Sequence, residues 1–266
     1  MNDIFSPRRF GKYLQYDLVN ARNNYGLSLL VSCCTPLMFY FVYQLFSLTL
    51  GNGWGDYHVG MQIAAFFVSW LIVSFFAPSK LYGKLTEKRA GTDWILIPAS
   101  PLEKTLSMFI VTCVVVPAVA LAAFCACDGL LSLVAPGYGP FIFGRNNLDL
   151  YDKATGMIGL WITPASFYIS FCCNILFFAL GAIIFKKSKV AKTILASFAL
   201  SILLSSAISA ITGTLSIDTE SLMRLIDVDS AEALQKSVNL FLNIYYLLFF
   251  AAVDLAIYFR IKTIKH

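Results

Sequence analysis

Few side chains in this sequence are suited to catalysis. The histidines are His58 and His266, neither lies in an HExxH motif, and the chain contains no GxSxG motif and no catalytic pair of acids. Gly83-Lys84 is followed by Leu85 and lacks the earlier glycine of a phosphate-binding loop. We therefore expect that the chain is not itself an enzyme and binds no cofactor or metal.

The seven cysteines do not suggest a metal or disulfide framework. All lie within apolar runs and none forms a CxxC pair: Cys33, Cys34, Cys113, Cys125, Cys127, Cys172 and Cys173. Cysteine in such surroundings behaves as a small apolar residue. We interpret all seven as packing residues.

Polar side chains inside the apolar segments are the remaining candidates. Serines and a glycine recur every four residues at Ser197, Ser201, Ser205, Ser209 and Gly213. Small residues on one ridge favour close helix packing, and a pathway lining is the alternative. Asn239, Asn243 and Asp254 share a second helix face. An acid inside a span marks either a functional site or an ion pair with a nearby cation.

The composition predicts an all-α integral membrane protein. Of 266 residues, 58% are apolar and 13% charged, whereas soluble domains carry roughly 25% charged residues. Six charge-poor segments each reach the roughly 17 to 25 residues that cross a membrane. We place these spans at about 27–50, 59–78, 105–127, 157–185, 193–217 and 237–259, within a single transmembrane domain of residues 1–266. No signal peptide is expected, because the 26 residues before the first span are largely polar.

The distribution of charge predicts the orientation. Of the 20 lysines and arginines, 16 lie in residues 1–26, 80–104, 186–192 and 260–266. Basic loops stay in the cytoplasm, so both termini should be cytoplasmic. The distribution also fits a membrane topology better than nucleic-acid binding.

Three segments outside the spans have helical signals. Ser6 and Pro7 begin an amphipathic helix over 6–25, which we expect at the membrane interface with its basic face toward anionic lipid; a solvated basic leader is the alternative. Two short outer helices are expected within 218–236. The 29-residue outer loop at 128–156 should fold back onto the membrane surface.

The connection between spans 2 and 3 is the most informative segment. Helix 2 should continue to Gly91, a C-cap, and Ser100 with Glu103 forms a capping box that starts helix 3. Residues 94–98 between them are apolar but too short to cross a membrane. They should therefore be buried in headgroups, in this protein or in a partner.

This pattern resembles the ABC-2 type exporter permeases. The run Arg89–Lys104 is similar to the LPAS-x-x-EK stretch of Bacteroidetes-like ABC permeases, with Ile97-Pro98-Ala99-Ser100 and Glu103-Lys104 at the matching positions. The outer loop at 128–156 is longer than is usual in that family.

The resemblance implies the permease subunit of an ATP-binding-cassette exporter in the plasma (inner) membrane. It would pair with a second permease, identical or paralogous, and with separate ATPase subunits that bind ATP and Mg²⁺. The ATPase-coupling loop would comprise Lys84, Glu87, Lys88, Arg89, Asp93, Trp94, Ile95 and Leu96. Two alternatives are a non-transporting membrane scaffold or sensor that docks a cytoplasmic partner, and an ion-coupled carrier that uses Asp254.

Overall fold

The computed structural model describes residues 5–51, 53–86, 91, 94, 96–135, 137–141, 164–214 and 231–263. This part of the chain is helical and contains no strand. Within these described ranges, five helical stretches are long and apolar enough to cross a membrane: Pro7–Thr49, Gly60–Thr86, Pro101–Val134, Lys189–Ser206 and Leu240–Thr263. A shorter apolar helix covers Tyr168–Ile184. The fold is therefore that of an all-helical, membrane-embedded protein, as the composition predicted.

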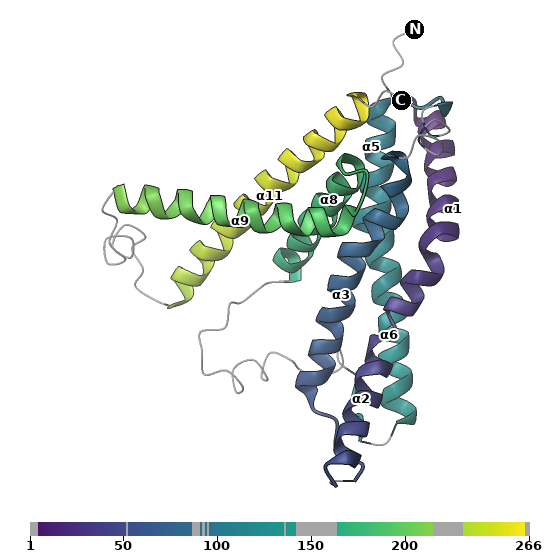
Figure 1. Ribbon diagram of the computed structural model, residues 1–266, viewed down its shortest axis with the longest axis vertical. Helices are drawn as coiled ribbons and strands as arrows, with labels where there is room; N and C mark the ends of the chain where they lie inside the picture. The colour runs from purple at the N-terminus through teal and green to yellow at the C-terminus, as the bar shows by residue number, and fades with distance from the viewer. Residues whose placement is uncertain are drawn as a thin grey trace. The chain divides into compact units, whose positions relative to one another are not determined.

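The chain divides into two compact units, each described by itself. Unit 1 comprises Met1–Leu81 and Ile97–Leu160, and unit 2 comprises Tyr82–Leu96 and Trp161–His266. The helices of unit 1 are α1 (Pro7–Ser32), α2 (Thr35–Thr49), α3 (Val59–Tyr82), α5 (Pro101–Ile110) and α6 (Val116–Val134), with a π turn, η2 (Val111–Val115), joining the last two (Figure 1). Those of unit 2 are the 3₁₀ turn η1 (Gly83–Thr86), α8 (Pro164–Ile184), α9 (Lys189–Thr214) and α11 (Ala231–Thr263).

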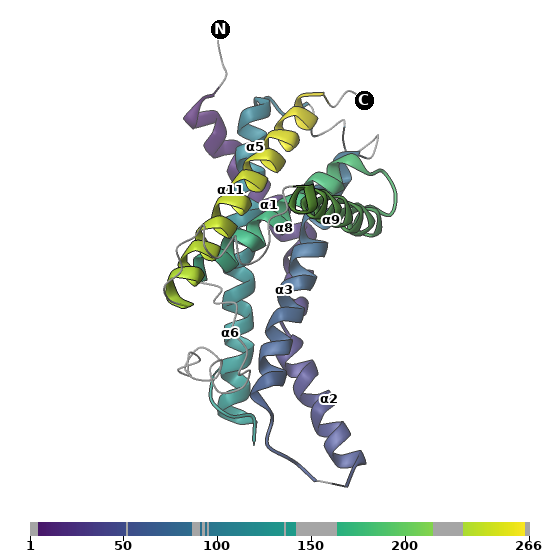
Figure 2. The same ribbon diagram turned by 90° about the vertical axis from the view of Figure 1, so that its left-hand side faces the viewer.

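Side-chain bonds to backbone carbonyls hold α3 against the α1–α2 junction. Thr35 Oγ1 donates to the carbonyl of Ala65 at 3.2 Å, and Ser69 Oγ donates to that of Ser32 at 3.3 Å. Because residue numbers rise on one side as they fall on the other, the chain through the α1–α2 junction runs antiparallel to α3. α3 also lies beside α6 (Figures 1 and 2), where the rings of Phe66 and Phe124 are 5.2 Å apart. The apolar faces of α2, α3 and α6 thus pack against one another in the core of unit 1.

The first helix is longer than the sequence analysis predicted. A separate interfacial helix over 6–25 was expected, but α1 runs to Ser32 and the chain turns at Cys33 and Cys34. Pro36, in the first turn of α2, explains this position, because proline has no N–H to continue the preceding helix. The amphipathic segment and the first apolar segment are therefore joined by continuous helix.

Pro117 has a similar effect between α5 and α6. Its ring cannot donate to the carbonyl four residues earlier and would clash with it in a regular helix. The chain widens into the π turn just before this proline, and Thr112 Oγ1 donates to the carbonyl of Met108 at 2.7 Å. The helix from Pro101 to Val134 therefore continues through the proline instead of ending there.

In unit 2, α8 and α11 run parallel. Cys173 Sγ donates to the carbonyl of Tyr246 at 3.2 Å, and one turn further along the rings of Phe177 and Phe249 lie 6.1 Å apart. The last helix begins at Ala231, so the second short outer helix expected before span 6 is instead its first turns. Ala-Glu-Ala-Leu-Gln-Lys at its start contains strong helix formers and no breaker. The first short outer helix falls outside the described residues.

Candidate functional site

The capping box predicted at the start of α5 is confirmed. Ser100 Oγ accepts the backbone N–H of Glu103 at 3.2 Å, and Glu103 Oε2 accepts the backbone N–H of Ser100 at 2.9 Å. Pro101 occupies the first helical position, where its missing N–H leaves no bond unmade. The start of α5 is therefore sharply defined immediately after the predicted coupling loop.

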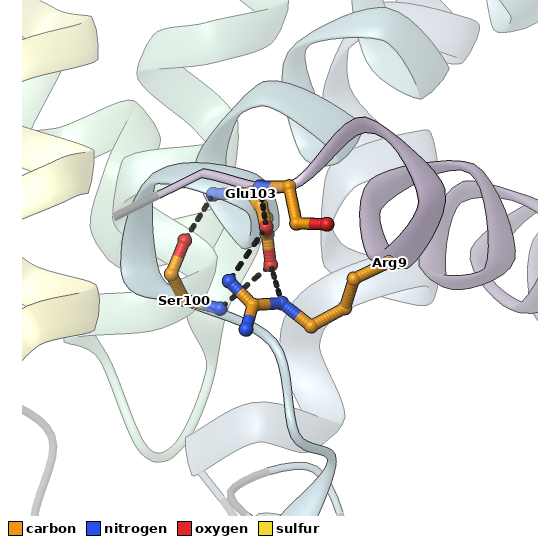
Figure 3. A network of polar contacts seen from close by, with 4 residues as sticks. Arg9, Ser100 and Glu103 are labelled. Carbon is orange, nitrogen blue, oxygen red and sulfur yellow. Dashed lines mark hydrogen bonds and ion pairs between the residues drawn. The ribbon is translucent and has the colours of Figure 1, made fainter. Parts of the chain in front are cut away.

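The same carboxylate also holds the start of α1. Glu103 Oε1 accepts the backbone N–H of Ser6 at 2.8 Å and Arg9 Nη2 at 2.8 Å, while Oε2 accepts Arg9 Nε at 2.8 Å (Figure 3). Glu103 is fully buried, whereas the Arg9 side chain is 31% exposed. A bidentate arginine–carboxylate pair fixes geometry as well as charge. One side chain thus joins two helix starts that are far apart in sequence.

A second polar contact lies further along the α1–α5 interface. Ser107 Oγ donates to Asp17 Oδ2 at 2.7 Å, and both side chains are buried. Lys104 and Thr105 of α5 are buried as well. Buried polar groups of this kind must be hydrogen-bonded to be tolerated. The helices α1 and α5 are therefore held together by polar contacts as well as by apolar packing.

The predicted coupling loop is described only in part. Lys84 is exposed, Trp94 is half-buried and Leu96 is 74% exposed. The other five residues, Glu87, Lys88, Arg89, Asp93 and Ile95, lie outside the described residues. The helix expected to continue to Gly91 changes to a 3₁₀ turn at Gly83. Leu96 therefore presents an apolar side chain just before the α5 cap.

The polar residues predicted inside the spans are not gathered into one site by the part of the chain that is described. Ser201 and Ser205 are exposed on α9, and Ser201 Oγ donates to the carbonyl of Phe198 at 2.8 Å. The side chains of Ser209 and Asn239 lie outside the described residues. On α11, Asn243 and Asp254 are half-buried, and each has a buried Oδ1 without a hydrogen-bond partner. Helix packing by the serine ridge stays a prediction.

A further buried carboxylate lies at the end of α6. Tyr138 donates its phenolic O–H to Asp128 Oδ1, and neither residue is exposed. Gln62 Nε2 donates to the carbonyl of Tyr138 at 2.9 Å, and the ring of Tyr57 stacks on that of Tyr138 at 5.2 Å. Burial raises the pKa of both tyrosines, and the nearby Asp128 raises each pKa further. Both phenols therefore stay protonated.

The sequence analysis missed these pairs for a physical reason. Arg9 and Glu103 are separated by 94 positions, and no local spacing rule connects them. Asp17 offered a signal, since it lies one turn after Tyr13 on the mostly apolar face of its helix. An acid on such a face requires a buried partner.

A comparison of the chain with protein-family models, with curated proteins and with solved structures finds no match. The resemblance of residues 89–104 to ABC-2 permeases therefore stays a prediction.

Proposed function

We propose that this chain is the membrane-spanning permease subunit of an ATP-binding-cassette exporter. The observation that carries the proposal is the buried Glu103 carboxylate, which joins the starts of α5 and α1 directly after the predicted coupling loop. A force applied to the loop would reach α5 through the backbone of residues 97–100. Because Arg9 ties α1 to the same carboxylate, both helices would move together.

The proposed topology has six spans with both termini in the cytoplasm of the plasma (inner) membrane. The spans correspond to the continuous α1–α2 segment, α3, α5 with α6, α8, α9 and α11. The clustering of basic residues in four segments supports this orientation. A second permease subunit, identical or paralogous, would complete the pathway.

ATP and Mg²⁺ would bind to separate ATPase subunits, since this sequence has no phosphate-binding loop. When those subunits close on ATP, they would press on residues 84–98. Transport then requires two alternative packings of the helices that follow the loop, with ATP binding favouring one of them. Glu103 and Arg9 would act as positioning residues in this change.

Substitution of Leu96 tests the proposed docking. Leu96 is 74% exposed, so Leu96→Ala should leave the fold intact, whereas loss of an apolar anchor at a protein interface weakens binding by about tenfold or more. We expect permease-dependent ATP hydrolysis by the complex to fall severalfold in Leu96→Ala and in Trp94→Ala.

Leu102→Ala is the matched control, because Leu102 is also exposed but lies beyond the loop, within α5. Hydrolysis that is unchanged in both loop variants, in a complex that still assembles, would contradict docking at this loop.

An ion-coupled carrier is the second candidate. The buried and unpartnered Oδ1 atoms of Asn243 and Asp254 on α11 favour it, since polar groups inside a span often mark an ion path. Under this alternative Asp254→Asn abolishes transport. Transport at the wild-type rate by Asp254→Asn would exclude it.

A further inference from the structure

The long helix from Pro101 to Val134 is interrupted by the π turn η2 (Val111–Val115). The backbone N–H of Val116 donates to the carbonyl of Val111, five positions earlier, whereas a regular α-helix pairs residues four positions apart. Bends in helices concentrate at such turns and at prolines, and Pro117 lies two residues after this turn. The junction of α5 and α6 is therefore the point at which this helix bends most easily.

Before the π turn, α5 is fastened to α1 by polar contacts. The Glu103 carboxylate accepts the backbone N–H of Ser6 and the Nε and Nη2 of Arg9, each at 2.8 Å. One helical turn later, Ser107 Oγ donates to Asp17 Oδ2 at 2.7 Å. Glu103, Ser107 and Asp17 are each no more than 5% exposed. These buried bonds join the two helices into one unit, which we call the α1–α5 pair.

After the π turn, α6 is fastened to different elements. The ring of Phe124 meets that of Phe66 on α3 edge to face, with the centroids 5.2 Å apart. Asp128 Oδ1 accepts the phenolic O–H of Tyr138, whose ring lies 5.6 Å from that of Tyr40 on α2. Phe124, Asp128, Tyr138 and Tyr40 are each no more than 3% exposed. We call α2, α3 and α6 the three-helix body.

Two helix junctions link the α1–α5 pair to the three-helix body within unit 1, and neither is regular α-helix. One is the π turn between α5 and α6. At the other, α1 ends at Ser32, the chain turns at Cys33 and Cys34, and α2 begins at Thr35 with Pro36 in its first turn. Each of the two chain paths is therefore broken between its two sets of buried contacts.

The π turn also carries a side chain that supports bending. Thr112 Oγ1 donates to the carbonyl of Met108 at 2.7 Å and lies 3.4 Å from the carbonyl of Phe109. Threonine hydroxyls bonded to the preceding turn in this way often bend helices. Thr112 is fully buried, so the hydroxyl, and not water, keeps a carbonyl paired when the backbone bonds lengthen.

We propose that the α1–α5 pair pivots as one unit against the three-helix body, bending at the π turn η2 and at Cys33–Cys34. Hinges of this kind consist of a few residues at the ends of elements. Bending at these two junctions leaves the buried contacts inside the pair and inside the body intact. The pivot deepens the proposed function and rests on it for the source of the force, whereas the bending itself is a property of this chain alone.

The separation of two spin labels across the π turn tests the pivot. Labels attached through p-acetylphenylalanine at the exposed positions Leu102 of α5 and Leu130 of α6 leave the native cysteines in place. Double electron–electron resonance on the purified full-length protein in lipid nanodiscs, with no partner present, measures the distribution of their separation.

Deletion of Val114 removes the extra residue of the turn and restores a regular helix, while the contacts of α5 and α6 keep their register. Val114 is 50% exposed, so its loss leaves no buried cavity. We expect the distribution to become about twofold narrower, because the helix no longer has a π turn at which to bend. Pro117→Ala stiffens the same junction without changing the chain length, and it should narrow the distribution in the same direction.

A label pair inside the three-helix body is the matched control, at the exposed positions Phe46 of α2 and Val119 of α6. Its distribution should be the same in the wild type and in both variants. Equal widths for the Leu102–Leu130 pair in all three proteins would overturn the pivot, and so would an equal narrowing of the control pair. Because no ATPase is present, this failure would leave the proposed function standing, and a failed docking test would leave the pivot standing.

Discussion

Glu103 illustrates how one buried side chain can fix two secondary-structure elements. Its carboxylate accepts the backbone N–H groups of Ser6 and Ser100 and pairs with Arg9. A buried charge is costly unless it is paired and hydrogen-bonded. Here both oxygens have partners, so the carboxylate stabilises the α1–α5 junction.

We expect Glu103→Gln to lower the free energy of unfolding by about 2 to 3 kcal/mol, because the ion pair is lost and Arg9 remains partly buried. Arg9→Gln should lower the free energy of unfolding by about the same amount. The loss in the double variant should be about 1 to 2 kcal/mol smaller than the sum of the losses in the two single variants. Denaturant unfolding in detergent measures all three.

Arg8→Gln is the control for this cycle, because Arg8 is adjacent but exposed. Arg8→Gln should change the free energy of unfolding by no more than about 0.5 kcal/mol. Strict additivity of the Arg9 and Glu103 effects would show that the pair is not energetically coupled.

Tyr138 and Asp128 form the second buried pair. Tyr138→Phe removes the O–H that bonds to the carboxylate while keeping the ring stacked on Tyr57. We expect a loss of about 1.5 to 3 kcal/mol in the free energy of unfolding, since hydrogen bonds to charged groups contribute that much. Denaturant unfolding in detergent measures this loss as well.

Tyr43→Phe provides the comparison, because Tyr43 donates to a backbone carbonyl at 3.0 Å in an exposed contact. Tyr43→Phe should lower the free energy of unfolding by less than about 1 kcal/mol. Equal effects of the two changes would argue against a special contribution from Asp128.

At the level of secondary-structure elements, the sequence predicted those helix starts that depend on interactions between neighbouring residues. The capping box at Ser100 follows from short-range hydrogen bonding, and the start of α1 at Pro7 follows from proline geometry, since the Ser6 side chain makes no capping bond. The end of α1 was not predicted, because Gly26 ended the polar segment but did not break the helix. Hydropathy locates where a chain enters apolar surroundings, and it does not locate helix ends.

The contact between α8 and α9 depends on a glycine. A Cβ at Gly181 would lie 2.0 Å from Thr193 Oγ1 and 2.8 Å from Thr193 Cβ. Gly181→Ala should therefore push α8 and α9 apart and lower the free energy of unfolding by about 1 to 3 kcal/mol. Gly129→Ala, at a helical glycine with nothing within 4 Å of the added Cβ, should be neutral or stabilising. Thermal unfolding in detergent compares the two, and equal stability would show that α8 and α9 do not pack closely at this point.

At the scale of the whole molecule, composition was sufficient to predict an all-helical membrane protein, since long apolar stretches have few other stable structures in lipid. The contacts that hold each unit together were not predictable. Arg9 with Glu103 in unit 1, and Lys189 with Gly83 in unit 2, join residues about 100 positions apart. Only the folded chain brings such residues together.

The two units are joined covalently at three places, Leu81–Tyr82, Leu96–Ile97 and Leu160–Trp161. The second link leads directly to the Ser100–Glu103 cap. Under the proposed function, this link transmits the action of the ATPase to the membrane helices. The chain would then never act alone, and its partner must carry the phosphate-binding loop.

The most direct test of the proposed function is to identify the chains that accompany this protein. The protein would be purified from its native membrane in mild detergent, and every associated chain would be identified by mass spectrometry. We predict a soluble subunit with a phosphate-binding loop in a fixed ratio to this chain, and its loss from the complex in Leu96→Ala. Recovery of this chain alone, or only with other membrane chains, under conditions that preserve known complexes would contradict the assignment as an exporter permease.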